Sequence, residues 1–258
     1  MLIDTHTHLY SSQFDEDRKS EIENCLSNNV GKMLLPNVDS KSIDGMHKLV
    51  TDYPGVCYPM MGVHPCSIQP EDWKEELKIA KDHLYGNIQN YIAVGEIGID
   101  LHWDKSTLSI QQEAFAEQIK WAKDLDLPIV IHARESFDEI FEVVDQYNDA
   151  SLKGIFHCFT GGKKEVEKIL SYGGFLMGIG GVLTFKNGGV AEVIKDYELS
   201  HFVLETDAPY LAPTPNRGKR NQSSYLPLIA EKMADVFGVS LPEIEEITTA
   251  NANQLFNL

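Results

Sequence analysis

Six side chains that can bind metal stand at the ends of predicted strands. They are His6, His8, Glu96, His132, His157 and Asp207. His6 and His8 lie two residues apart, so on a strand they would share one face with backbones about 6–7 Å apart. Imidazoles at that spacing can converge on one divalent cation, with N–metal bonds of about 2.0–2.1 Å. Because an α/β barrel carries its chemistry at its strand ends, the pattern predicts a metal site there.

Glu96 and Asp207 add carboxylates to this predicted site. Glu96 lies in the apolar run Ala93–Ile97, where an ionised side chain is costly unless it is paired or bound to metal. A glutamate can also bridge two cations, which lie about 3.5–4 Å apart in two-metal sites. Asp207 ends the eighth predicted strand, where it can bind metal and accept a proton from an attacking water. We therefore assign catalytic roles to both carboxylates.

Five further residues near strand ends each allow two interpretations. His64 ends the third strand and either contacts a substrate oxygen and carries a proton, or shapes the turn before Pro65. Asp4 either hydrogen-bonds a ligand ring or begins the strand, and Glu205 lies behind the ligands or inside the barrel. Arg134 either grips a phosphate or pairs with a nearby acid. Trp103 can stack a nucleobase, but the interpretation that we favour packs it on a neighbouring helix.

The segment Asn216–Asn221 is the one dense positive cluster of the chain, with Arg217, Lys219 and Arg220. Guanidinium groups match phosphate oxygens with two parallel hydrogen bonds. Phosphate sites of α/β barrels commonly use the loops after strands seven and eight. The segment is therefore predicted to bind substrate phosphate, the alternative being an ordinary solvated loop.

Short apolar runs alternate along the chain with amphipathic stretches. The predicted strands are Leu2–His6, Lys32–Asn37, Val56–Val63, Tyr91–Ile97, Pro128–His132, Gly154–Phe159, Gly174–Ile179 and Phe202–Thr206. Helical periodicity marks Glu113–Leu125, Lys163–Tyr172 and Ser223–Phe237, and Ser240 to Glu243 reads as a capping box that opens a last helix.

Eight such units predict an α/β protein with a closed (β/α)8 barrel, as one domain over residues 1–258. The alternative is an open doubly wound sheet, which would place a glycine-rich phosphate loop after an early strand. No such loop occurs there. The later run Gly178–Gly181 is interpreted as a tight turn.

Composition narrows the possible partners. The 258 residues include 43% hydrophobic and 24% charged residues, and the formal net charge is −17. This charge weighs against broad, nonspecific binding to DNA or to anionic membranes, because both need a positive surface. The chain enters a strand at once without a signal-peptide pattern, has no long apolar run, and its four cysteines form no CxxC pair. We therefore expect a cytoplasmic protein with reduced thiols and no membrane segment.

These residues resemble the TatD family of metal-dependent deoxyribonucleases, within the amidohydrolase-like barrels. The resemblance runs the whole chain in order. It rests on the segments Ile3–Leu9, Gly62–Pro65, Val94–Asp100, Gln112 to Gln118, Pro128–Arg134, His157–Gly161, Leu204–Leu211, Arg217–Asn221 and Asn251–Phe256.

The resemblance implies two divalent ions, which could be Mg, Mn, Zn or Co. It implies that His6, His8, Glu96 and Asp207 hold one ion, and that Glu96, His132 and His157 hold the other. It further implies hydrolysis of DNA phosphodiesters, in single-stranded or end-containing DNA, with His64 and Asp207 near the reacting water. No obligate protein partner is implied.

Two segments depart from the family pattern. Asn221-Gln222-Ser223 stands where the family usually has Asn-Glu-Pro, and Leu101-His102-Trp103 replaces the usual paired aromatic residues. Both changes touch loops near the expected substrate. An alternative function is hydrolysis of a small ester, lactone or amide, or of an aminoacyl-nucleic acid ester, at the same metal site. A scaffold that keeps an inactive barrel is disfavoured, since all six ligands are present.

Overall fold

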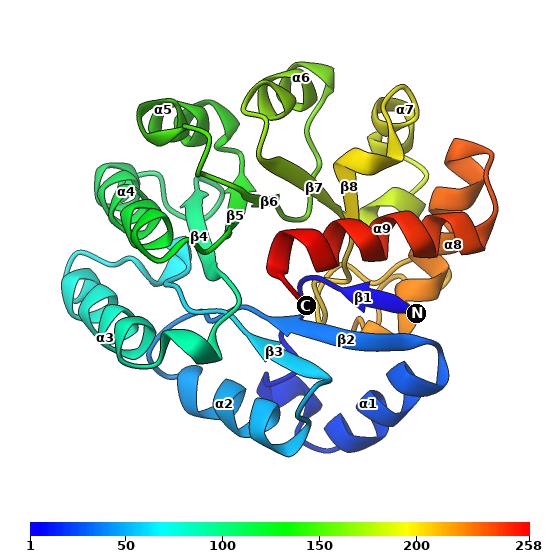
Figure 1. Cartoon of the computed structure of the whole chain (residues 1–258), viewed down its shortest axis with the longest axis horizontal. Coiled ribbons are helices and arrows are strands. Elements are labelled where there is room, and N and C mark those ends of the chain that lie inside the picture. The colour runs from blue at the N-terminus through cyan, green and yellow to red at the C-terminus, as the bar shows by residue number, and fades with distance from the viewer.

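The structure is a computed structural model that describes all residues 1–258. Eight parallel strands form the centre of the molecule (Figure 1). The strands are β1 Leu2–Asp4, β2 Val30–Leu35, β3 Cys57–Pro59, β4 Val94–Asp100, β5 Ile129–Arg134, β6 Gly154–Phe156, β7 Phe175–Ile179 and β8 Phe202–Leu204. They form the runs β1-β2-β3 and β4-β5-β6-β7-β8, in chain order throughout. Sequential parallel order is what repeated β-then-α units produce.

Backbone hydrogen bonds join the two runs on both sides. Between β3 and β4, the amide of Met61 donates to Ala93 at 3.1 Å and the amide of Gly95 donates to Met61 at 3.1 Å. Between β1 and β8, the amide of Thr5 donates to Leu204 at 3.0 Å. The predicted (β/α)8 barrel is therefore confirmed, and the open doubly wound sheet is excluded, because such a sheet keeps two free edges.

An outer layer of helices surrounds the strands (Figure 1). The helices are α1 Arg18–Ser27, α2 Ile43–Asp52, α3 Trp73–Gly86, α4 Leu108–Leu125, α5 Phe137–Tyr147, α6 Lys163–Ser171, α7 Val190–Ile194, α8 Leu226–Phe237 and α9 Leu241–Phe256. The predicted helices reappear. Helix α6 begins at Lys163 as predicted, α4 begins before Glu113, and Ser223–Tyr225 is a short 3-10 turn ahead of α8. The Ser240 hydroxyl accepts the amide of Glu243 at 3.4 Å, as the predicted cap of α9 requires.

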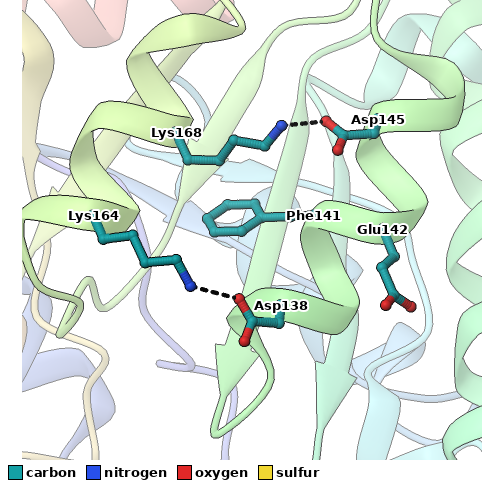
Figure 2. A pocket seen from close by; sticks show the side chains of 6 residues that line it. All are labelled: Asp138, Phe141, Glu142, Asp145, Lys164 and Lys168. Carbon is teal, nitrogen blue, oxygen red and sulfur yellow. Dashed lines mark hydrogen bonds and ion pairs between the residues drawn. The ribbon is translucent and has the colours of Figure 1, made fainter.

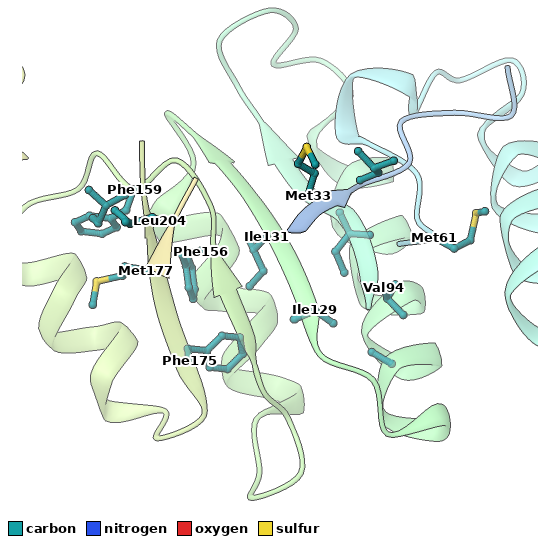
Figure 3. Close-up of a cluster of buried hydrophobic side chains, with 14 of the residues drawn as sticks. Met33, Met61, Val94, Ile129, Ile131, Phe156, Phe159, Phe175, Met177 and Leu204 are labelled. Atoms are coloured by element: carbon teal, nitrogen blue, oxygen red, sulfur yellow. The ribbon is translucent and has the colours of Figure 1, made fainter. Parts of the chain in front are cut away.

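The larger core lies between the strands and the helices. Figure 3 shows part of it, where Ile129 and Ile131 of β5 and Phe156 of β6 turn outward. A second, smaller cluster fills the barrel. It consists of Ile3, Leu34, Met60, Ala93, Val130, Ile155 and Val203 with Ala252 and Phe256 of α9. Helix α9 crosses this end of the barrel, next to both chain termini (Figure 1). The opposite, carboxyl end of the strands is left for chemistry.

Two smaller predictions about the chain can be settled from the fold. Gly178 and Ile179 belong to β7, and the turn predicted at Gly178–Gly181 begins only at Gly180, before a 3-10 turn over Gly181–Thr184. All four cysteines are unpaired, as predicted. No helix has the length and apolar character needed to cross a membrane.

Candidate metal centre

The carboxyl ends of the strands bring all the predicted ligands together. They are His6 and His8 after β1, Glu96 in β4, His132 in β5, His157 after β6 and Asp207 after β8. Glu96 is the centre of the cluster and is 1% exposed. Each of its ion-pair partners is a histidine, and neither lysine nor arginine reaches it.

One oxygen of Glu96 faces the side chains that follow β1. Its Oε2 lies 3.1 Å from Nε2 of His6 and 3.6 Å from Nε2 of His8. These two nitrogens are 3.3 Å apart. Oδ1 of Asp207 lies 3.8 Å from the His6 nitrogen and 3.6 Å from the His8 nitrogen. Two imidazoles and two carboxylates thus converge on one small space.

The other oxygen of Glu96 faces a different set of imidazoles. Its Oε1 lies 2.8 Å from Nδ1 of His132 and 2.8 Å from Nε2 of His157. His64 also points here, with its Nε2 3.3 Å from the same oxygen. Glu96 therefore stands between two groups of nitrogen donors and contributes one oxygen to each.

Electrostatics keep Glu96 ionised although it is buried. Burial alone would raise the pKa of a carboxyl group. The surrounding imidazoles, His157 first and then His64 and His6, outweigh that effect and hold the pKa of Glu96 well below its usual range. Burial lowers the pKa of His6, which favours the neutral imidazole that metals bind.

Tyr10 fixes the ring of His8, a role that the sequence analysis missed. The Tyr10 hydroxyl donates to the carbonyl of Pro36, so it must accept from Nδ1 of His8, 2.9 Å away. That contact places the hydrogen of a neutral His8 ring on Nδ1. The Nε2 lone pair is then left facing Glu96 and Asp207.

Asp100 fixes His132 in the same way and was likewise missed. Its Oδ2 lies 2.9 Å from Nε2 of His132, which leaves Nδ1 for Glu96. Burial opposes ionisation of Asp100, but the contact with His132 lowers its pKa to about 2. Asp100 follows Gly98 by two residues in β4, and Gly98 pairs with His132 of β5. This pairing register brings Asp100 to His132, and it is visible only in the fold.

The contacts of Asp4 differ from both roles predicted for it from the sequence. Its carboxylate accepts the Thr206 hydroxyl at 2.6 Å, the Thr206 amide at 2.9 Å and the His6 amide at 3.3 Å. Asp4 is thus neither the partner of a ligand ring nor a strand-start turn residue, because it ties β1 to the segment after β8. Burial raises its pKa to about 7.

Glu205 lies inside the barrel behind the ligands, in agreement with the prediction. It is fully buried, and its Oε1 accepts the amide of Cys158 at 2.6 Å. The same oxygen lies 3.5 Å from Nδ1 of His157. Glu205 therefore backs His157 from the barrel interior.

The donor set fits divalent cations. Imidazole nitrogens and carboxylate oxygens suit Zn, Mn and Co, and the carboxylates also suit Mg. Several ring nitrogens face one another or a carboxylate, as they do around a shared cation. The residues that can hold a metal include the groups His6–His8–Glu96 and His64–Glu96–His132.

The predicted phosphate-binding residues are differently engaged. Arg217 and Lys219 are exposed, and the Arg217 guanidinium lies over the ring of Phe185 at 3.4 Å from its centroid. Arg220 instead forms two bonds to Asp17, at 2.8 and 2.6 Å, so it is the least available of the three for a substrate. Asn221 is buried and donates to the carbonyls of Thr206 and Tyr210, which holds the segment that carries Asp207.

Trp103 differs from the interpretation that we favoured from the sequence. It does not pack on a helix, since 73% of its side chain is exposed. The Arg134 guanidinium lies over its ring, 5.5 Å from the centroid, and the His102 ring meets it edge-on at 4.9 Å. The helical packing prediction is therefore wrong, because the loop after β4 is held by Asp100 in a position that carries the indole into solvent.

A groove between α5 and α6 is separate from the metal centre. Lys164 pairs with Asp138 at 3.0 Å and Lys168 pairs with Asp145 at 2.6 Å, on either side of Phe141 (Figure 2). Both lysines are neutralised within the groove. None of the candidate metal ligands lines it.

Comparison with known proteins agrees with this geometry. The sequence profile of the family described as TatD related DNase matches residues 3–257. The chain is 35% identical to the uncharacterised metal-dependent hydrolase YabD of Bacillus subtilis, with both chains covered fully. It is 30% identical to the 3′-5′ ssDNA/RNA exonuclease TatD of a Rahnella species, with 97% of this chain and 96% of that protein covered.

A solved structure shares the same architecture. YjjV, a TatD homologue from Escherichia coli K12, superposes with a TM-score of 0.92 at 26% identity, over 100% of this chain and 98% of that one. The centre of histidines and carboxylates thus lies in a barrel of a known type. The chain belongs to the TatD family of metal-dependent hydrolases.

Proposed function

We propose that this protein is a deoxyribonuclease that hydrolyses phosphodiester bonds with two divalent ions. The observation that carries the proposal is the position of Glu96, whose two oxygens face separate groups of imidazoles. We assign one ion to His6, His8, Glu96 and Asp207, and the other to Glu96, His132 and His157. Bound ions would acidify a water molecule and offset the negative charge of the phosphodiester.

Asp207 and His64 are suited to proton transfer. Burial opposes ionisation of Asp207, but its contact with His8 and the neighbouring His157 and His6 lower its pKa. It is therefore ready to accept a proton at neutral pH. Nδ1 of His64 accepts the amide of Cys66 at 3.0 Å, so a neutral ring carries its hydrogen on Nε2. That hydrogen points into the centre and can be donated to a substrate oxygen.

Three exposed cationic side chains are available for the phosphate backbone: Arg134, Arg217 and Lys219. We assign substrate contacts to them, with Arg220 as a fourth, weaker candidate because Asp17 already engages it. The exonuclease named among the relatives acts on single-stranded DNA and RNA, which supports a single-stranded or end-containing DNA substrate here. The four unpaired cysteines suit a reducing compartment, and we place the protein in the cytoplasm.

The test is cleavage of end-labelled single-stranded DNA by chelator-stripped protein, with and without added Mg²⁺, Mn²⁺, Zn²⁺ or Co²⁺. We expect a metal-dependent ladder that shortens from one end, and labels at the 5′ and 3′ ends in parallel reactions give the polarity. Failure to cut with any metal, in folded protein that takes up the ions, would contradict the proposal. Turnover of small esters, lactones or amides by the same sample would then identify the alternative function.

A further inference from the structure

We infer that Trp103 is a stacking surface for one base of the substrate strand, an inference that rests on the proposed function. Trp103 has the largest exposed fraction of the large hydrophobic side chains, at 73%. The other two tryptophans, Trp73 and Trp121, are 8% and 2% exposed. An indole left in water next to a candidate active centre is the kind of surface on which a flat base can lie.

The backbone of Trp103 is tied directly to the metal centre. Oδ1 of Asp100 accepts the amides of His102 at 2.9 Å and of Trp103 at 3.2 Å. Oδ2 of the same carboxylate holds the ring of His132. One side chain thus sets the position of a candidate metal ligand and of the indole together.

The loop that presents the indole is also held at its base. The Gln111 side chain accepts the amide of Asp100 at 2.8 Å and donates to its carbonyl at 3.1 Å. The amide of Leu101 donates to the carbonyl of Arg134 at 3.0 Å. A base that stacks here would therefore order little additional chain, which favours binding.

The side chains around the indole suit a nucleotide. The Arg134 guanidinium lies over the ring, 5.5 Å from its centre, which places a positive charge next to a flat apolar surface. A nucleotide offers both complements, a base for the ring and a phosphate for the charge. A small ester or lactone offers no such flat surface, and one indole is too small a patch for a protein partner.

The overall charge explains why stacking would matter in this chain. With a net charge of −17, the protein gains little from general attraction to a polyanion. Stacking is insensitive to that charge, and loss of one stacked base weakens binding by about 5- to 100-fold.

The experiment combines protein variants with abasic positions in the substrate. We compare the wild type with Trp103→Ala, Trp103→Phe and Trp103→Leu, and use Tyr85→Ala on the outer helix α3 as the matched exposed aromatic control. Single-stranded oligonucleotides carry one abasic residue at successive positions from the cleaved end. For each pair we measure kcat/KM, and thermal unfolding shows that the variants fold.

We expect Trp103→Ala and Trp103→Leu to lower kcat/KM by about 5- to 100-fold, and Trp103→Phe to retain most of it. At one abasic position the wild type should lose the same factor, whereas Trp103→Ala should lose nothing more, because the partners form one pair. Binding of uncut oligonucleotide to metal-stripped protein should quench tryptophan emission, and Trp103→Ala should remove that quenching, since the other two tryptophans are buried.

Two failures are distinguishable. If the wild type cuts oligonucleotides and Trp103→Ala cuts them equally well at every abasic position, the stacking inference is overturned and the nuclease function stands. If the wild type cuts no oligonucleotide with any metal, the proposed function itself is overturned.

Discussion

The two ends of the barrel interior are formed by the same strands, but one end is apolar and the other carries ionisable side chains. At the end covered by α9, Val130, Ile155 and Val203 pack into a closed apolar cluster. Two residues further along β5 and β6 stand His132 and His157, which point into the same interior but face Glu96. The first end stabilises the fold by removing apolar surface from water, at about 25 cal/mol per Å².

The second end gathers carboxylates and imidazoles that water would otherwise solvate. Buried groups of this kind cost stability unless they are paired or bound to metal. Substitutions at the α9 end should therefore lower stability and spare chemistry in the folded fraction. Substitutions at the carboxyl ends of the strands should instead remove activity while the barrel still folds.

The largest effect is expected at Glu96. Glu96→Ala removes the carboxylate that the two groups of candidate ligands share, so kcat/KM on DNA should fall by at least about 10³-fold, with the barrel still folded. Metal-dependent stabilisation should disappear with it, which amounts to about 2.7 kcal/mol per site at a metal concentration 100 times the Kd. Thermal unfolding with and without metal and steady-state kinetics measure both, with exposed Glu113→Ala as the control. Near-normal turnover in Glu96→Ala would show that the ligands are wrongly assigned.

The opposite effect is expected at Phe256, the aromatic side chain of α9 that packs against the inner cluster. Phe256→Ala opens a cavity there and should lower the free energy of unfolding by about 3–5 kcal/mol. Because the metal centre lies at the other end of the strands, kcat of the folded protein should hardly change. Denaturant unfolding and kinetics at low temperature make the comparison, with exposed Leu26→Ala as the reference. A loss of kcat as large as the loss of stability would mean that the two ends are coupled.

A smaller, more selective effect is expected at Asp100. Asp100→Ala releases the ring of His132 and should weaken metal binding by about 10- to 100-fold. Asp104→Ala is the control, since Asp104 lies in the same loop but its carboxylate accepts hydrogen bonds only from Ser106. Calorimetric metal titration of both variants gives the result. Equal metal affinity in the two variants would remove Asp100 from the site.

The smallest effect is expected at Arg220. Its bond to Asp17 is partly exposed, so Arg220→Gln should lower the free energy of unfolding by less than about 1 kcal/mol. Arg217→Gln and Lys219→Gln should instead raise KM for DNA and flatten its dependence on salt, because each removes a free positive charge. Kinetics at several salt concentrations separate the two cases. A rise in KM for Arg220→Gln as large as for Arg217→Gln would restore Arg220 to the substrate site.

The convergence of the candidate ligands was predictable because their residue types recur at the ends of apolar runs. His132 and His157 follow Val130 and Ile155 by two residues, and the period of a strand places each pair on one face. Glu96 breaks this rule: it lies three residues after the inward-facing Ala93. Strand β4 shifts register between Val94 and Ile97, and this irregularity allows Glu96 to point inward. A local irregularity of that kind has no signal in the residue period.

Roles that depend on contacts between distant segments could not be predicted. The sequence places Asp4 beside His6, but its partner Thr206 is brought there only when β1 closes against β8. The sequence does not distinguish Tyr10 from an ordinary apolar residue, because Pro36 and His8 reach its hydroxyl only in the folded chain. The engagement of Arg220 by Asp17 likewise joins two loops far apart in the chain. The sequence therefore predicts which side chains gather at the carboxyl ends of the strands better than it predicts which hydrogen bonds hold those side chains in place.

The most direct test of the account is anomalous diffraction from crystals soaked in Mn²⁺. We expect two metal peaks on opposite sides of the Glu96 carboxylate, one beside His6, His8 and Asp207 and the other beside His132 and His157. A single peak that takes both oxygens of Glu96, or metal bound away from Glu96, would contradict it.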